Sequence, residues 1–204
     1  MALNILIVDK RIKPILFFGM SFPVLWLLYG WYYVIGTDFY FLTANPIEYS
    51  NRFLGDWALR FILLGLSVTP LMDLPGFKPL NRVRRMVGLF AFFYVSLHLI
   101  SYIALDHFFN WNEIFGDIIK RNFITVGMVA FILLLPLAIT SNNKMQKRLT
   151  YKRWKKLHRL IYGISILGIF HYFMMIRGDQ LEPKVYAGIL FGLLGYRVVK
   201  YIKH

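Results

Sequence analysis

Cysteine is absent from the 204 residues, and charged residues are scarce, at 17% of the chain. The lack of cysteine excludes disulfide scaffolds, thiolate metal sites, iron–sulfur clusters and catalysis by a thiol. A glycine-rich dinucleotide motif, a P-loop and an HExxH zinc motif are also missing, which argues against a nucleotide-binding module or a soluble-type catalytic centre. The chain is instead rich in apolar residues, with 58% hydrophobic and 18% aromatic. This composition indicates a protein of the lipid bilayer.

Six apolar stretches follow one another along the sequence and predict six transmembrane helices. A span needs about 17 to 25 residues at 1.5 Å per residue; five stretches reach that length, and the second is marginal and carries Arg60. Because the connecting segments are short, we expect one all-α membrane domain over residues 1–204, folded as a six-helix bundle. The stretches lie near residues 14–35, 57–72, 86–105, 123–140, 160–176 and 185–202.

Lysine and arginine are distributed unevenly between alternate connecting segments. The four segments on one predicted side hold 18 basic and 2 acidic residues, whereas the three on the other side hold 5 basic and 8 acidic residues. The positive-inside rule therefore predicts that both termini are cytoplasmic. The densest basic run, residues 144–156, fits this sorting and attraction to anionic lipid better than nucleic-acid binding. Docking of an acidic cytoplasmic partner on the same run stays open.

Three histidines lie in or beside the predicted helices. His98 and His171 lie about 18 and 16 Å from the inner edge of the hydrocarbon core, on helices that run in the same direction. The two imidazoles therefore share a depth near the middle of the membrane. His158 lies about 20 Å nearer the cytoplasm, at the start of the fifth helix.

An ionisable side chain at such a depth indicates a functional site or a paired polar contact. Neutral imidazoles are axial ligands for haem iron, and the residue pattern places haem ligation by His98 and His171 modestly ahead of a structural hydrogen bond or a proton relay. On a straight helix His158 and His171 point about 140° apart, so they share a wall only if the helix bends, for which Gly163 and Gly168 are candidates. Otherwise His158 serves a separate inner site for a second haem, a flavin or a quinone. The spacing favours one doubly ligated haem over two.

These residues occur in a set of motifs that resembles the MsrQ (formerly YedZ) family of haem-binding membrane subunits. That family lies within the ferric-reductase-like transmembrane group, which includes the NADPH oxidases. The resemblance extends over nearly the whole chain, and the combined set of motifs is specific, whereas LHxxxY alone is not. The motifs are WALRF at 57–61, VTPL at 68–71, RRMVGL at 84–89, LHLISY at 97–102, LAITS at 137–141, WKKLH at 154–158 and IFHY at 169–172.

The resemblance implies a function in electron transport. It implies that His98, His158 and His171 are the haem-associated histidines, that the haem is of the b type, and that flavin mononucleotide (FMN) is a further cofactor. It also implies a place in the bacterial inner membrane, electrons from the quinone pool or a cytosolic flavin reductase, and delivery to MsrP. MsrP is a periplasmic molybdopterin enzyme that reduces methionine sulfoxide in oxidised proteins.

The chain also departs from the larger relatives in this group. It lacks their cytoplasmic flavin and nicotinamide domain, so the electron donor is expected to be a separate protein or quinol. It also lacks the second histidine that the two-haem relatives carry on the third helix, which puts a second haem in doubt. At the matching depth the third helix carries Arg84 and Arg85.

The hypothesis that follows is electron transfer across the membrane, from the inner basic loop through a haem held by His98 and His171. Arg60 is expected to pair with an outer haem propionate or, with equal weight, to extend to the outer interface. Arg84 or Arg85 is expected to meet an inner propionate or an anionic cofactor. The outer segments 36–56 and 106–122 are the expected surfaces for the periplasmic partner, although interfacial aromatic belts explain their composition equally well.

Two other classes of function stay open. A stand-alone ferric-chelate reductase would use the same helices and release electrons to a soluble acceptor. A transporter or proton-relay protein would use the histidines without iron, but the sequence shows no inverted repeat and no pair of broken helices.

Overall fold

The computed structural model describes residues 11–37, 41–176 and 180–203, and within these ranges the chain forms helices and no strand. The helices are α2 (Lys13–Thr37), α3 (Pro46–Met72), η2 (Lys78–Leu80), α4 (Asn81–Ser101), the π-helical turn η3 (Tyr102–Asp106), α5 (Trp111–Lys120), α6 (Asn122–Ile139), α7 (Asn143–Leu149), α8 (Tyr151–Leu157), α9 (Leu160–Met175) and α10 (Leu181–Ile202).

The prediction of an all-α bundle with six spans is confirmed. Six helical segments of the described chain are long and apolar enough to cross a bilayer, and the chain is a multi-pass membrane protein. These segments are Lys13–Thr37, Pro46–Met72, Lys78–Asp106, Asn122–Ile139, Tyr151–Met175 and Leu181–Ile202.

The second span is longer than its apolar stretch of residues 57–72 suggested. It has 27 residues and begins at Pro46, where the side chain of Asn45 accepts a hydrogen bond from the Glu48 N–H and caps the helix. The added turns carry charged residues, which is why hydropathy alone missed them. They extend α3 to the end of the bundle at which the cavity described below opens.

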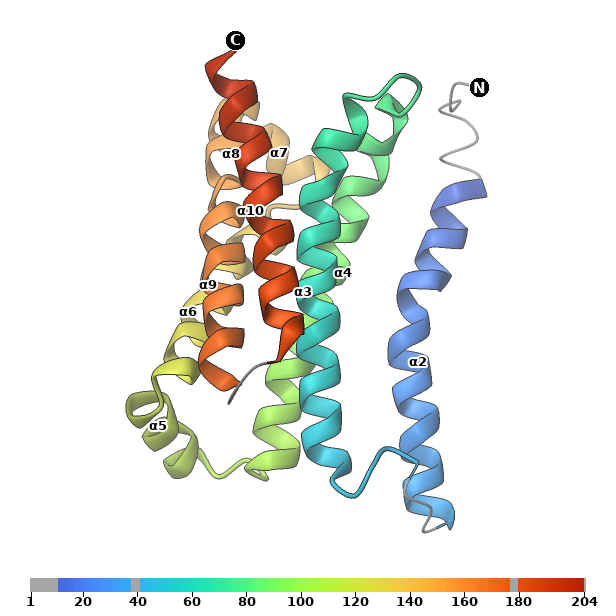
Figure 1. Cartoon of the computed structure of the whole chain (residues 1–204), viewed down its shortest axis with the longest axis vertical. Coiled ribbons are helices and arrows are strands. Elements are labelled where there is room, and N and C mark those ends of the chain that lie inside the picture. The colour runs from blue at the N-terminus through green and yellow to red at the C-terminus, as the bar shows by residue number, and fades with distance from the viewer. Residues whose placement is uncertain (1–10, 38–40, 177–179, 204) are drawn as a thin grey trace.

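The spans pack around a central pair, α3 and α4, with α6 and α9 on one side and α10 across the front (Figure 1). Phe61, Leu66 and Tyr94 are almost fully buried at the centre of this core. In the most apolar 18-residue part of α10, only 6% is buried inside the bundle, so most of that helix faces lipid. α2 stands at the edge and meets α3 and α4.

Tyr94 joins α2 to the core through the backbone of α2. Its hydroxyl donates a hydrogen bond to the carbonyl of Met20 at 2.9 Å and accepts one from the Val24 N–H at 3.1 Å. Pro23, which lies between them, has no N–H of its own and weakens the helical hydrogen-bond pattern at this point. A buried hydroxyl with two backbone partners therefore holds α2 against α4 where α2 is weakest.

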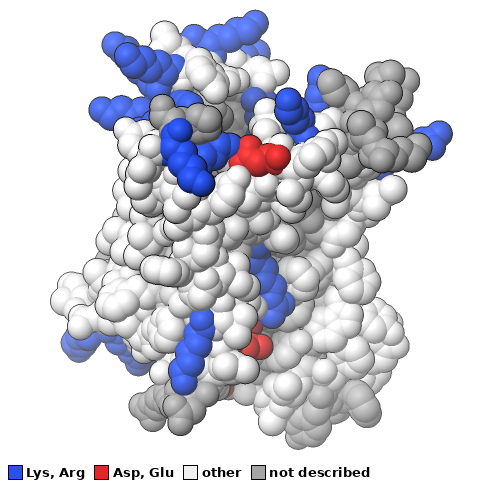
Figure 2. All heavy atoms as spheres, turned by 45° about the horizontal axis from the view of Figure 1, so that its top comes forward, with Lys and Arg blue, Asp and Glu red and all other residues white. Residues whose placement is uncertain are grey.

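The described chain begins in α2 and ends in α10 at the same end of the bundle (Figure 1). Figure 2 shows lysine and arginine side chains gathered around this end. The helices α7 and α8, which carry most of the basic run 144–156, also lie there. The structure thus places the two ends of the described chain together with the basic surface, as an even number of spans requires.

The fifth span is interrupted, but not at the two glycines considered above. α8 ends at Leu157 and α9 begins at Leu160, so the break falls at His158 and Arg159. Gly163 and Gly168 both lie within α9. His158 is therefore separated from the straight helix that carries His171.

Replacing Tyr94 with Phe removes both hydrogen bonds to α2 and leaves the ring in place. We expect a loss of about 1 kcal/mol in unfolding free energy, because the backbone groups of α2 lose a buried partner. Thermal unfolding in detergent measures the change. Tyr33→Phe is the control, because the Tyr33 hydroxyl accepts only an exposed hydrogen bond from Tyr29. An equal loss in both variants would contradict the role of Tyr94.

Candidate functional site

His98 on α4 and His171 on α9 meet in the interior of the bundle. Their ring centres lie 6.2 Å apart, and the ring planes make an angle of 78°. The structure thus brings together the two histidines that the sequence placed at the same depth. The two helices reach this point from opposite sides of a cavity and are not joined here by any hydrogen bond between the imidazoles.

Each imidazole is anchored through Nδ1 to a backbone carbonyl. Nδ1 of His98 lies 2.9 Å from the Asn51 oxygen, and Nδ1 of His171 lies 2.7 Å from the Phe123 oxygen. A carbonyl can only accept, so in both rings Nδ1–H is the donor and Nε2 keeps its lone pair. A metal-binding histidine is usually held in this way, with its second nitrogen oriented by a carbonyl.

Two glycines on the facing helices provide room for the imidazole rings, because they have no side chain. A Cβ atom on Gly55 of α3 would lie 3.2 Å from the His98 ring, and one on Gly127 of α6 would lie 3.0 Å from the His171 ring. Any larger residue at either position would have to displace an imidazole. The rings are therefore confined between their own helix and the backbone of a facing helix.

The rings face a cavity of about 620 Å³ bounded by α3, α4, α6 and α9, and both histidines line it. This volume lies within the usual range of about 300 to 1,000 Å³ for ligand pockets. The inner part of the cavity is walled by apolar side chains, which suit a flat hydrophobic ligand. These include Leu59, Ile62, Val95, Ile124, Phe131 and Leu134.

The arrangement of the histidines fits a six-coordinate haem iron. Two iron–nitrogen bonds of about 2 Å, plus about 1.1 Å from each nitrogen to its ring centre, place two axial imidazoles about 6 Å apart between centres. The observed 6.2 Å agrees with that separation. Two free Nε2 atoms, fixed tautomers and an apolar slot are the features that this ligand needs.

The other end of the cavity is polar. Arg52 and Arg121 line it, and each is paired with a carboxylate four residues earlier: Arg52 with Glu48 at 2.7 Å and Arg121 with Asp117 at 3.3 Å. The hydroxyl of Tyr102, which also lines the cavity, is buried and has no hydrogen-bond partner. This end, called the mouth below, thus presents two ion-paired arginines and the Tyr102 hydroxyl.

Sequence reasoning missed the residues of the mouth and both glycines. One signal was present, because Tyr102 follows His98 by four residues and therefore lies on the same face of the helix. Arg52 and Arg121 carried no such signal. They line the same cavity because the first turns of α3 and the start of α6 lie at the same end of the bundle.

Arg60 does not line the cavity. Its Nε donates a hydrogen bond to the Tyr186 hydroxyl at 2.8 Å, and its guanidinium carbon lies 4.9 Å from the centre of the Trp57 ring. Tyr172, stacked on Tyr186, donates to Glu182 at 3.1 Å. The structure therefore places Arg60 in a polar contact between α3 and α10, turned away from the two histidines.

His158 lies at the basic end, apart from the cavity. Its Nε2 lies 3.1 Å from the Thr140 hydroxyl, and its ring is 4.0 Å from the ring of Trp154 between centres. Trp154 in turn donates to the Thr140 carbonyl at 3.0 Å. These three residues form one cluster that joins the end of α6 to α8.

Arg84 and Arg85 also lie at the basic end and do not line the cavity. Arg85 donates a hydrogen bond to the Asn143 side chain at 2.6 Å. Both arginines lie within electrostatic range of His158, and Arg84 also faces Tyr162. The structure brings the two arginines together with His158, but separates all three from His98 and His171.

Comparisons with known proteins were made for the whole chain. A family model described as "Ferric reductase like transmembrane component" matches residues 54–169. A protein of Rhodospirillum rubrum named "Protein-methionine-sulfoxide reductase heme-binding subunit MsrQ" is 51% identical over 96% of this chain and 91% of its own length. The protein of that name in Herminiimonas arsenicoxydans is 52% identical over 77% of this chain and 73% of its own length.

A longer protein also matches. The "Magnetosome protein MamZ" of Paramagnetospirillum magneticum is 42% identical over 91% of this chain, which corresponds to 29% of that protein. No solved structure shows significant similarity.

Replacing Gly127 with Ala places a methyl group 3.0 Å from Nδ1 of His171. We expect the ring to shift by a few tenths of an ångström, its hydrogen bond to Phe123 to lengthen, and haem binding to weaken by about tenfold, as for other disturbed supporting contacts of metal ligands. Haem per chain and haem titration of the apoprotein measure the change.

Gly163→Ala is the matched control, because nothing lies within 4 Å of a Cβ atom at that position of α9. Unchanged haem affinity in Gly127→Ala would show that the ring is not confined as described.

Proposed function

The chain belongs to the ferric-reductase-like transmembrane family and, within it, to the MsrQ heme-binding subunits, and from this premise we propose that it carries electrons across the membrane on haem. The observation that carries the proposal is the pair of anchored imidazoles 6.2 Å apart in an apolar cavity. Bound haem would supply reversible one-electron chemistry. The protein contributes binding, orientation and exclusion of water.

His98 and His171 would hold the haem iron through their Nε2 atoms. Because the chain has no cysteine, the haem cannot be attached through thioether bonds, which is consistent with the b type that the family resemblance implies. We propose one doubly ligated haem between the two rings, as the spacing of the histidines in the sequence favours. The whole of residues 1–204 would act as a single membrane domain around it.

The acidic edge of the haem would face the mouth of the cavity. Arg52, Arg121 and the Tyr102 hydroxyl provide charge-assisted and neutral donors for the propionates. This assignment replaces Arg60, Arg84 and Arg85 as propionate partners, because none of these three lines the cavity. We propose that Arg60 instead holds α10 against α3 through Tyr186.

The basic end would be the cytoplasmic end, in agreement with the positive-inside rule. Electrons would enter there, from a quinol or a separate flavin reductase, and leave at the mouth toward a periplasmic reductase of methionine sulfoxide, MsrP. The membrane would be the bacterial inner membrane. The names of the relatives, which specify methionine sulfoxide reductase, support a reductase of that kind as the electron acceptor.

The cluster of His158, Arg84 and Arg85 would serve the inner half of the path. Its positive charge suits an anionic group such as the phosphate of FMN, and a second haem with His158 as ligand is the alternative inherited from the family resemblance. A haem bound through His158 Nε2 would have to displace the Thr140 hydroxyl from that nitrogen. This cost makes the inner site secondary to the cavity.

A stand-alone ferric-chelate reductase is the second candidate function, favoured by the description of the matching family. It would use the same haem and the same mouth. Reduction of an iron chelate by vesicles that contain this protein and no periplasmic reductase would distinguish it from the subunit. A transporter has no support from the geometry, because both histidines in the cavity are fixed by the backbone.

The proposal is tested by His98→Ala, His171→Ala and His158→Ala. We expect the first two variants to lose the sharp bands of low-spin haem in reduced-minus-oxidised spectra, because each removes one axial ligand, and His158→Ala to retain them. In liposomes with ferricyanide inside and a reductant outside, we expect the first two to slow electron transfer by at least about tenfold. A colourless wild type after haem supplementation would contradict the proposal.

The orientation of the haem is tested with haem dimethyl ester, in which both propionates are blocked. We expect the wild-type apoprotein to bind haem about tenfold more tightly than the ester, because a charge-assisted pair at a partly exposed site is worth about 1.5 kcal/mol. The double variant Arg52→Gln/Arg121→Gln is expected to bind the two equally. Arg85→Gln is the control at the opposite end. If the double variant still binds haem more tightly than the dimethyl ester, the propionates lie elsewhere.

A further inference from the structure

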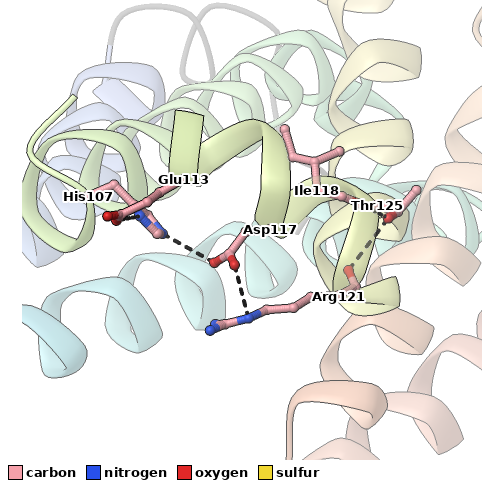
Figure 3. Close-up of polar contacts among 6 residues, drawn as sticks. All are labelled: His107, Glu113, Asp117, Ile118, Arg121 and Thr125. Atoms are coloured by element: carbon pink, nitrogen blue, oxygen red, sulfur yellow. Dashed lines mark hydrogen bonds and ion pairs between the residues drawn. The ribbon is translucent and has the colours of Figure 1, made fainter. Parts of the chain in front are cut away.

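His107 occupies an unusual position at the mouth of the cavity, between η3 and α5. Its Nδ1 lies 3.5 Å from Glu113 and its Nε2 lies 3.4 Å from Asp117, so each ring nitrogen faces a different carboxylate. The His107 side chain is only 14% exposed and lines the same cavity as His98 and His171. Figure 3 shows the ring pointing toward both acids, with Asp117 turned also toward Arg121.

The contacts of His107 suit two protonation states. Both distances exceed the usual 2.7 to 3.2 Å of an N–H···O hydrogen bond. Neutral imidazole carries one N–H, so one of its nitrogens must then direct a lone pair at a carboxylate, whereas imidazolium carries a donor on each nitrogen. Nδ1 of His107 and Oδ2 of Asp117 are buried and have no hydrogen-bond partner. In imidazolium, Nδ1–H would point at Glu113 and Nε2–H at Asp117, so each ring nitrogen would have a carboxylate acceptor.

Carboxylates outnumber cations around His107. Carboxylates reach this end from three elements: Glu48 from α3, Asp106 from η3, and Glu113 and Asp117 from α5. They outnumber the two arginines of the mouth, Arg52 and Arg121. The ring of Tyr102 also lies against the ring of His107. Haem propionates would add further negative charge.

His107 is also connected to the haem ligand through its packing. The ring of Tyr102 lies 4.6 Å from the ring of His107 between centres, and Tyr102 follows His98 by one helical turn. The chain forms a π-helical turn here, and Phe108 and Phe109 adopt left-handed backbone angles, with φ of 45° and 62°. Such irregular backbone is costly and is commonly found at functional sites. It turns the chain so that His107 faces inward.

We propose that His107 takes up a proton when the haem between His98 and His171 accepts an electron. The inference rests on the proposed function. Bound haem would supply the one-electron change, with a quinol or reduced flavin as the electron donor, and His107 would gain one proton from the outer aqueous phase for each electron taken up. When the electron leaves, the proton returns. The proton offsets the charge that the electron brings into a poorly solvated cavity.

The test is the midpoint potential of the haem as a function of pH, measured by spectroelectrochemistry on the purified full-length protein between about pH 5 and 9. For the wild type we expect the potential to fall as pH rises, with a limiting slope of about 59 mV per tenfold change in proton concentration, the value for one proton per electron. For His107→Gln we expect a nearly flat dependence with unchanged haem bands.

Two further variants complete the test. Glu113→Gln keeps the imidazole but removes one carboxylate partner of the imidazolium. We therefore expect the pH range over which the midpoint potential changes to move to lower pH. This variant also keeps the test valid if His107→Gln does not retain haem. Lys200→Gln is the control: it removes a charge at the opposite, basic end of the bundle, where Lys200 pairs with Asp73, so the slope is expected to stay.

The outcomes separate this inference from the proposed function. A flat wild-type dependence, or an equal slope in His107→Gln, would overturn the role of His107 while the haem spectrum still supports electron transfer. A slope that disappears when wild type is loaded with haem dimethyl ester would assign the proton to a propionate, and would also overturn it. Absence of haem from the wild type would instead contradict the proposed function itself.

Discussion

The hydrogen bond from each cavity histidine to a backbone carbonyl is the interaction on which the rest of the site depends. In a bilayer, an imidazole without a partner is costly, so His98 and His171 need acceptors for Nδ1–H. Asn51 and Phe123 supply these acceptors from the facing helices. The same bonds fix both tautomers, leave both Nε2 atoms toward the cavity and set the distance between the rings.

This requirement explains other features of the bundle. The rings can reach the facing backbone only because Gly55 and Gly127 have no side chain in the way. The carbonyl acceptors lie next to the mouth in sequence, Asn51 beside Arg52 and Phe123 two residues after Arg121. The structure that anchors the histidines therefore also places the cations of the mouth. The first turns of α3, which the sequence did not predict, line this end of the cavity, and α5 contacts two of its residues, His107 and Arg121.

The sequence predicted the class of fold and the central pair of residues, because both depend on properties that lie along the chain. Hydropathy and the rise per residue were sufficient to find six spans and to place His98 and His171 at one depth. Contacts between helices could not be predicted in this way. Depth alone left Arg60 with two expectations of equal weight, a haem propionate or the outer interface, whereas its place on α3 directs it to Tyr186. Arg52 and Arg121 were missed because they meet only through packing.

The most direct measurement of the central claim is the low-temperature electron paramagnetic resonance spectrum of the oxidised, haem-loaded protein. Two imidazoles on one iron give a low-spin ferric signal, and ring planes close to perpendicular, at 78° here, make that signal strongly anisotropic. The structure predicts this spectrum. A high-spin ferric signal in the wild type would show that the iron lacks one of the two histidines, and would contradict the account.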